Sequence, residues 1–155
     1  MKSFSFSKHR LHDLLRDGQV GLYAQLTGKN HFLTGSVVEG NRLGRTLGFP
    51  TINLDLIPED QTLPANGVYA VSVEIEGKYY AGMANVGIRP TIPGTQLVVE
   101  ANLFDFHQDI YGASVIIHFV ERIREEKKFP GLEALKKQLG EDKKLCVAFF
   151  ANMKL

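Results

Sequence analysis

Between residues 32 and 123 the chain alternates apolar and polar residues with a period of two, in short segments separated by turns. In residues 68–76, for example, Tyr69, Val71 and Val73 fall on one side of an extended backbone and polar residues on the other. Short strands joined by turns, with no helical segment between them, pair antiparallel rather than parallel. Closure into a barrel removes the exposed edges of such a sheet. The sequence therefore predicts a mainly β fold built on an antiparallel barrel.

The predicted strands cover residues 32–39, 68–76, 79–86, 97–106 and 115–123. Glu76-Gly77-Lys78 is expected to join the second and third strands as a hairpin. Helical spacing is confined to the two ends of the chain, over residues 8–28 and after residue 132. A C-terminal helix that caps the barrel is predicted from Leu132, Leu135, Leu139, Leu145, Phe149 and Met153. We expect an N-terminal helical extension over residues 1–28 and one barrel domain over residues 29–155.

The composition fits a single globular domain, because 44% of the 155 residues are hydrophobic and 23% are charged. A net charge of +1 argues against a duplex-DNA-binding protein, so we expect no nucleic-acid partner. Cys146 is the only cysteine, which excludes an internal disulfide and favours a reducing compartment. No apolar run approaches the ~18 residues of a membrane span and no signal peptide is evident, so we expect a cytoplasmic protein without a membrane partner. A monomer is the simplest expectation.

Residues 40–53 concentrate three glycines, two arginines and a Pro-Thr-Ile-Asn end. Glycines let backbone N–H groups close on an anion and arginines add forked positive donors, so phosphate is the expected guest. Thr51 and Asn53 point the same way on an extended backbone, and their neutral oxygens suit magnesium. The segment is not a P-loop, because it is one residue short, has Arg45 in place of lysine and continues into Pro50, which blocks a helix. A glycine-rich hairpin with a basic tip is the alternative.

Four further features are candidate catalytic, binding or metal-ligating sites. Glu100 shares a strand face with apolar neighbours, and a partly desolvated carboxylate suits a general base; an exposed strand glutamate is the alternative. Residues 85–91, rich in glycine, arginine and proline, form either a flap or an ordinary crossover loop. Residues 122–129 carry a dense charge run, which is either a binding segment or a solvated connection between strand and helix. His9 and His12 are spaced for one helix face, where solvated surface is preferred to a metal pair.

Six motifs occur in order over residues 30–150. They are Gly-Arg-x-x-Gly-x-Pro-Thr-x-Asn at 44–53, Gly67-Val68-Tyr69, Asn85-x-Gly87-x-Arg89-Pro90-Thr91, the strand from Glu100 to Asp105-Phe106, Tyr111-Gly112, and Arg124-x-Glu126-x-x-Phe129 ahead of Leu132-Glu133-x-Leu135. Together they resemble the riboflavin kinase (flavokinase) family, which includes stand-alone enzymes and the C-terminal kinase module of bacterial bifunctional FAD synthetases. Ile52 stands where that family usually has alanine, and its side chain points away from Thr51 and Asn53.

The resemblance implies a six-stranded antiparallel Greek-key barrel with a C-terminal helix. It also implies transfer of the ATP γ-phosphoryl group to the 5′-hydroxyl of riboflavin, which gives FMN and ADP. By position, Glu100 becomes the catalytic base, and Thr51 and Asn53 become ligands of Mg²⁺, with Zn²⁺ or Mn²⁺ as alternatives. The implied ATP-binding residues are Gly40, Arg42, Gly44, Arg45, Gly48, Pro50, Thr51, Asn53 and Asn85. The implied flavin-binding residues are Arg124, Glu126 and Phe129.

Two other kinds of barrel stay open at this point. A non-catalytic flavin-binding barrel would not need Thr51, Asn53 and Glu100 together, and an oligonucleotide-binding barrel fits poorly with a net charge of +1 and no tryptophan. Residues 1–28 resemble the stretch that joins the two halves of the bifunctional enzymes. We therefore expect either a monofunctional kinase that kept this connector or a fragment of a longer protein, and we do not expect FAD synthesis from residues 1–155.

Overall fold

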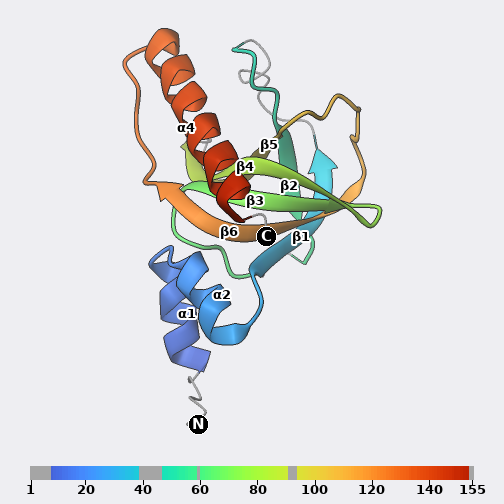
Figure 1. The fold of residues 1–155 in the computed structure, drawn as a ribbon, viewed down its shortest axis with the longest axis vertical. Helices are drawn as coiled ribbons and strands as arrows, with labels where there is room; N and C mark the ends of the chain where they lie inside the picture. The colour runs from blue at the N-terminus through green and yellow to red at the C-terminus, as the bar shows by residue number, and fades with distance from the viewer. Residues whose placement is uncertain (1–7, 39–46, 59, 91–93, 154–155) are drawn as a thin grey trace.

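The computed structural model describes residues 8–38, 47–58, 60–90 and 94–153. Its centre is a closed antiparallel barrel (Figure 1) of strands β1 (His31–Val38), β2 (Ile52–Leu56), β3 (Gly67–Ile75), β4 (Lys78–Pro90), β5 (Thr95–Leu103) and β6 (Ser114–Arg124). Helices α1 (Lys8–Arg16), α2 (Val20–Thr27) and α4 (Leu132–Met153) pack around it. The predicted mainly β class and the six-stranded barrel are confirmed.

The strands follow the order β1-β2-β5-β4-β3-β6, and β6 pairs with β1 to close the barrel. Within this order β3, β4 and β5 are successive neighbours and β6 returns beside β3, which is the Greek-key arrangement. Periodicity alone does not identify β2, because only five residues alternate there and they directly follow the glycine-rich segment. The strand expected at residues 79–86 is longer in the structure, where β4 continues through Pro90.

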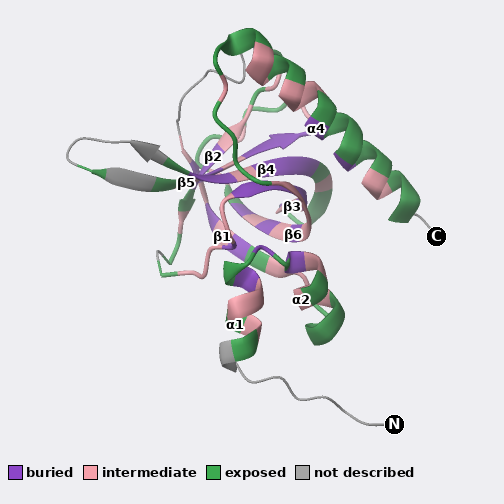
Figure 2. Ribbon diagram, turned by 90° about the vertical axis from the view of Figure 1, so that its left-hand side faces the viewer, coloured by how far each residue is buried: buried purple, intermediate pink, exposed green. Residues whose placement is uncertain are grey.

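Alternating apolar side chains fill the interior of the barrel, where burial is concentrated (Figure 2). Tyr69, Val71 and Val73 of β3 are fully buried there, as the period-two pattern predicts. The Tyr69 ring meets Phe119 of β6 edge to face, with ring centroids 5.2 Å apart. Burial raises the pKa of Tyr69 to about 12, so its hydroxyl stays protonated and donates to the Ala65 carbonyl.

The two N-terminal helices cover one end of the barrel (Figure 1). Leu15 of α1 and Val20 of α2 are buried in the same hydrophobic cluster as the barrel interior. Gly18 joins the helices with a left-handed backbone (φ 78°), at a point where an added side chain would press against Arg122 of β6. The Ala65 N–H donates to the Leu15 carbonyl at 3.0 Å, which ties the helices to the segment before β3. The residues before position 28 therefore share a hydrophobic cluster with the barrel.

Helix α4 lies along the outer side of the barrel, against β3, β4 and β6 (Figures 1 and 2). Val68 and Ala70 of β3 and Met83 of β4 form a second buried cluster there with Cys146 of the helix. Strand β3 is consequently buried on both faces over its first half. The predicted C-terminal helix is confirmed, but it covers the side of the barrel rather than its end.

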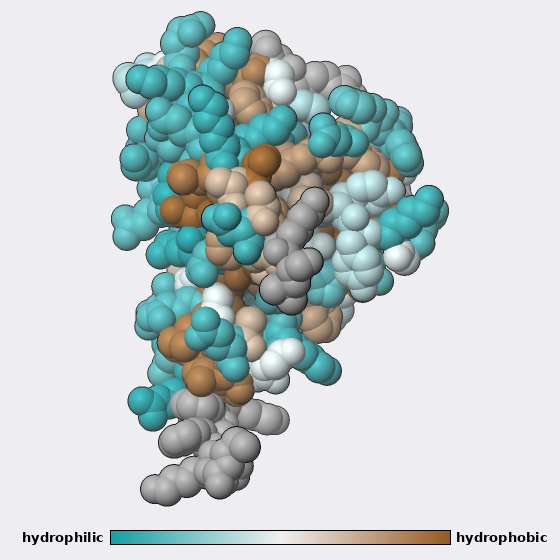
Figure 3. Space-filling model, viewed as in Figure 1, coloured by the Kyte–Doolittle hydropathy of each residue, from teal (hydrophilic) through white to brown (hydrophobic). Residues whose placement is uncertain are grey.

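The apolar face predicted for α4 is partly wrong. Leu139 and Phe149 pack against the barrel, and Asp142 and Cys146 share that face with them at helical spacing. About half of each side chain is exposed at Leu132, Leu145 and Met153. The outer surface of α4 is mostly hydrophilic (Figure 3), because its lysines and glutamates lie there. Within the described part of the chain, no helix has the length and apolar character that a bilayer crossing requires.

Two glycines are expected to respond to alanine in opposite directions. A Cβ atom at Gly35 of β1 would collide with the Asp55 carbonyl of β2, whereas one at Gly140 of α4 meets nothing within 4 Å. We expect Gly35→Ala to lower the free energy of unfolding by about 1–3 kcal/mol because the β1–β2 backbones must separate. Gly140→Ala should raise it by roughly 0.5–1 kcal/mol because alanine favours the helix. Urea titrations of both variants measure this, and a neutral Gly35→Ala would contradict the close strand approach.

Candidate active site

Polar side chains of three neighbouring strands line up across the outer face of the barrel. Glu100 of β5 pairs directly with Asn53 of β2 on one side and with Asn85 of β4 on the other. Directly paired residues of antiparallel strands point to the same side of a sheet, with Cβ atoms roughly 5 Å apart. Ile52 and Val99, at the adjacent positions, pack into the barrel interior, so the three polar side chains face outward. One carboxylate therefore lies between two amides.

Thr51 adds a hydroxyl beside this row, just before β2. Its Oγ1 lies 3.4 Å from Oε2 of Glu100, which is longer than a strong hydrogen bond. Asn102, two residues after Glu100 on β5, is buried, and its Nδ2 donates to the Pro50 carbonyl at 2.7 Å. This bond fixes the peptide that precedes Thr51 against β5. The threonine hydroxyl and the glutamate carboxylate are thereby held next to each other.

The side-chain oxygen of Asn53 is buried and receives no hydrogen bond from the described residues. Asn53 is 8% exposed, and its Oδ1 atom has no hydrogen-bond partner among the residues that the structure describes. Leaving a buried acceptor unpaired costs roughly 1–3 kcal/mol. A neutral amide oxygen in such a position is a good ligand for a hard cation. The side-chain oxygen of Asn53 is therefore suited to coordinate a metal ion.

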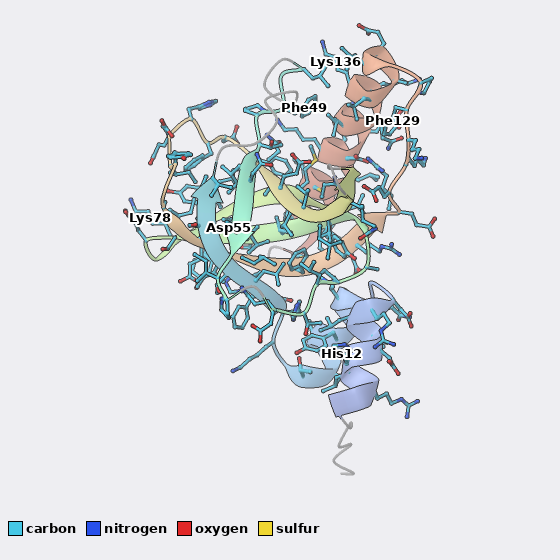
Figure 4. The ribbon with its side chains drawn as sticks, turned by 180° about the vertical axis from the view of Figure 1, so that it is seen from behind. His12, Phe49, Asp55, Lys78, Phe129 and Lys136 are labelled. Atoms are coloured by element: carbon cyan, nitrogen blue, oxygen red, sulfur yellow. The ribbon has the colours of Figure 1, made fainter. Side chains whose placement is uncertain are left out.

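A cavity of about 310 Å³ lies between this face of the barrel and α4. Polar groups of β4, β5 and Thr51, which precedes β2, line part of it, together with charged groups at the end of β6 and just after it. Its apolar lining is Leu47, Phe49, Val68, Met83, Ala84, Phe129, Leu135 and Leu139. In Figure 4, Phe49 and Phe129 lie at the end of the molecule where α4 begins, near Lys136, whereas His12 lies at the opposite end. A cavity with apolar walls and a few converging polar groups is typical of a small-molecule site.

A bulge in β6 directs Arg124 toward this cavity. Val68 of β3 pairs with Arg124, whereas the next residue, Tyr69, pairs with Arg122, so Ile123 is an extra residue in β6. Bulges of this kind re-aim the side chain that follows them. Arg124 consequently lies opposite Val68 on the outer face and lines the cavity.

A fully buried carboxylate of α4 holds the Arg124 guanidinium. Nε of Arg124 donates to Oδ1 of Asp142 and Nη2 donates to Oδ2, each at 2.9 Å. Gln138 Nε2 donates a further bond of 2.9 Å to Oδ1 of Asp142. The guanidinium carbon lies 5.8 Å from the ring centroid of Phe129, which lines the cavity together with Glu126. Helix α4 thus determines the position of the Arg124 guanidinium, which lines the cavity.

Cys146 lies one helical turn beyond Asp142 and is fully buried. Desolvation, and secondly the negative charge of Asp142, raise the pKa of its thiol to about 12. A thiol with this pKa stays protonated near neutral pH and is a poor nucleophile. Cys146 therefore serves packing between α4 and the barrel.

The structure brings most of the predicted site residues that it describes to one region. The predicted base and all three predicted flavin-side residues line the cavity together with Thr51 and Asn85. Asn53 lies in the same cross-strand row, next to the cavity lining. Gly48, with a left-handed backbone (φ 86°), and Pro50 lie just before β2. The other predicted ATP-binding positions fall outside the described residues: Gly40, Arg42, Gly44 and Arg45.

The loop or flap predicted at residues 85–91 is wrong for residues 85–90. These residues continue β4 and pair with β5 as far as Pro90 opposite Thr95. The pairing with β5 makes these residues part of a long hairpin, which the local glycine and proline content did not indicate. Thr91 lies outside the described residues.

Sequence reasoning missed the roles of Asn102 and Asp142. Alternation places Asn102 on the face of Glu100, but nothing in the sequence identifies the Pro50 carbonyl as its acceptor. Asp142 carried a usable signal, because it falls at helical spacing from Leu139 and Cys146 on the buried face. A carboxylate on such a face requires a buried cationic partner.

A closed antiparallel barrel with a polar cross-strand row over a cavity defines a small-molecule-binding barrel, and comparison with known proteins specifies the family. A family model described as riboflavin kinase matches residues 27–150. The bifunctional riboflavin kinase/FMN adenylyltransferase of Bacillus subtilis is 41% identical over 143 residues, which make up 90% of this chain and 45% of that protein. The chain thus spans about half the length of the curated relatives it matches.

Two solved structures are also similar. A Streptococcus pneumoniae structure described as a macrolide-efflux protein is 40% identical, with a TM-score of 0.85 over 94% of this chain and 48% of that one. The riboflavin kinase of Trypanosoma brucei is 27% identical, with a TM-score of 0.53 over 79% of this chain and 78% of that one. The chain belongs to the riboflavin kinase family.

Proposed function

We propose that this chain is a riboflavin kinase module that transfers the ATP γ-phosphoryl group to the 5′-hydroxyl of riboflavin. The observation that carries the proposal is the cross-strand row, in which Glu100 lies between Asn53 and Asn85 with Thr51 Oγ1 at 3.4 Å. This row combines one carboxylate with neutral oxygen and amide groups at the edge of a cavity. Family membership supplies the reaction class, and the row supplies groups suited to it.

Thr51 Oγ1 and Asn53 Oδ1 are the proposed ligands of a divalent cation. The fit rests on the buried Oδ1 atom, which receives no hydrogen bond from the described residues, and on the outward direction that both side chains share. Two neutral oxygens suit Mg²⁺, which keeps several waters and phosphate oxygens among its ligands; Zn²⁺ and Mn²⁺ are the alternatives. Such a cation, when bound, neutralises charge on the phosphate groups. Asn102 supports the site, because it anchors the peptide before Thr51.

Glu100 is the proposed general base. Its carboxylate accepts the proton of the riboflavin 5′-hydroxyl as that oxygen bonds to the γ-phosphorus and ADP leaves. Thr51 Oγ1 lies 3.4 Å from this carboxylate, and strand pairing places Asn53 and Asn85 on either side of Glu100. The apolar lining of the cavity, with Phe129 and Arg124 beside it, is the proposed wall for the flavin ring system.

The first experiment is a product assay. Purified protein is incubated with riboflavin, ATP and magnesium, and flavins are separated by chromatography. We expect FMN as the only new flavin, in proportion to ADP. Tight flavin binding without ATP-dependent FMN formation would favour a non-catalytic flavin-binding barrel, and FAD formation would contradict the restriction to the kinase reaction.

Glu100→Gln is expected to lower kcat by roughly 10²- to 10⁴-fold, because the amide keeps the shape of the side chain but cannot take the proton. The KM values for ATP and riboflavin should change little. Steady-state FMN formation measures both parameters. Glu76→Gln, on the exposed β3–β4 turn, is the matched control and should behave as wild type. A kcat within a few-fold of wild type would remove Glu100 from the role of base.

Asn53→Ala is expected to raise the magnesium concentration for half-maximal rate by on the order of tenfold or more, because an oxygen of the cation site is lost. The rate as a function of magnesium at saturating riboflavin measures this. Asp55→Ala is the control, because Asp55 lies two residues further along β2 on the same outer face and is exposed (Figure 4). An unchanged magnesium titration for Asn53→Ala would exclude Asn53 as a ligand.

A further inference from the structure

Asp142 is a charged residue in a position where burial costs free energy. It is completely buried on the face of α4 that packs against the barrel, next to Cys146. Its carboxylate receives three donors, two from Arg124 and one from Gln138. The Arg124 side chain is 14% exposed, so both members of this ion pair have lost most of their water.

Stability alone does not account for such a pair. Removing two charges from water costs several kcal/mol per ion, and well-packed apolar residues often serve as well or better. What the pair does provide is direction, because two parallel hydrogen bonds to a planar guanidinium allow one orientation. Gln138 in turn holds the carboxylate from the neighbouring helical turn.

Arg124 contacts the segment after β6, which forms part of the cavity wall. Its remaining nitrogen, Nη1, donates to the Glu125 carbonyl at 2.9 Å, and its guanidinium lies 5.8 Å from the Phe129 ring centroid. Arg124 thus connects the end of β6 to the segment that follows it. Glu126 and Phe129 of this segment line the cavity, while Leu135 and Leu139 of α4 line it from the helix.

We propose that Asp142 is a positioning residue for the flavin substrate, which acts through Arg124 and the segment of residues 125–129. The carboxylate on α4 sets the guanidinium, and the guanidinium sets the backbone at Glu125 and the ring of Phe129. Asp142 itself does not line the cavity. The metal and nucleotide groups proposed on β2 and β5 are held by other contacts, namely Asn102 to Pro50 and the strand pairing. The inference rests on the proposed function, and it predicts a defect confined to one substrate.

Asp142→Asn is the test variant, because it keeps the shape of the side chain and removes the charge. We expect the KM for riboflavin to rise by roughly tenfold or more as the wall of the cavity loses its fixed position. The KM for ATP and the magnesium requirement should stay within twofold of wild type. Riboflavin binding, followed by quenching of flavin fluorescence, should weaken in parallel. Glu141→Gln, the exposed neighbour on α4, is the matched control and should change none of these quantities.

A double-mutant cycle tests the route through Arg124. Arg124→Gln alone should raise the riboflavin KM, and adding Asp142→Asn to it should raise the KM less than twofold further. Independent, multiplicative effects would overturn the proposal. Equal rises in the KM for riboflavin and for ATP would also overturn it, because general loosening of the fold predicts that result. The proposal would also be overturned if the KM of Asp142→Asn for riboflavin were within twofold of that of the Glu141→Gln control.

Asp142→Asn leaves Arg124 partly buried without its counter-charge, so it carries a risk of unfolding. Gln138→Leu is the second variant, because it removes one donor to Asp142 and leaves the ion pair intact. If Asp142→Asn does not fold, a riboflavin-specific KM rise of about two- to fivefold for Gln138→Leu supports the proposal, and no rise overturns it. Wild-type protein that forms no FMN would instead refute the proposed function, which keeps the two failures distinct.

Discussion

The pairing register of β2, β5 and β4 is the constraint on which the rest of the site depends. Asn53, Glu100 and Asn85 stand side by side only because these strands pair at these residues. A slip of one residue would turn Glu100 into the barrel and Val99 out of it. The apolar residues that alternate with the row, Ile52 and Val99 among them, prevent this slip because the core would lose them. The hydrophobic core therefore determines the position of the polar row.

Helix α4 converts this exposed face into a cavity. The first half of β3 carries apolar residues on both faces, and the outer ones, Val68 and Ala70, require a cover. Cys146 provides it in the second half of the helix, Leu139 packs on the same cluster and also lines the cavity, and Leu135, one turn earlier, lines the cavity. The cavity thus arises where the helix begins to separate from the barrel, beside Glu100.

Much of this arrangement could be predicted from the sequence, and the exceptions have physical reasons. Alternation identified the interior of β3 correctly, because period two directly reports which side of a strand is buried. It failed for residues 85–90, where glycine and proline indicate a loop although long-range pairing with β5 makes them a strand. Leucine spacing identified α4 but assigned Leu132 and Leu145 to its buried face, because residue type was weighed above position. The motifs indicate Thr51 and Glu100 as candidates, whereas their proximity follows from the pairing register of β2 and β5.

The two polar clusters of the cavity differ in how they are built, and this difference bears on what each can do. Near Glu100 the groups are held by strand backbones, whose pairing tolerates little movement. Near Phe129 the segment after β6 has no strand partner in the described chain, so its position depends on side-chain contacts. A neutral contact would leave such a segment several positions of similar energy, whereas the bidentate Arg124–Asp142 pair selects one. The buried ion pair therefore occurs at the point of the cavity where the backbone alone provides no fixed geometry.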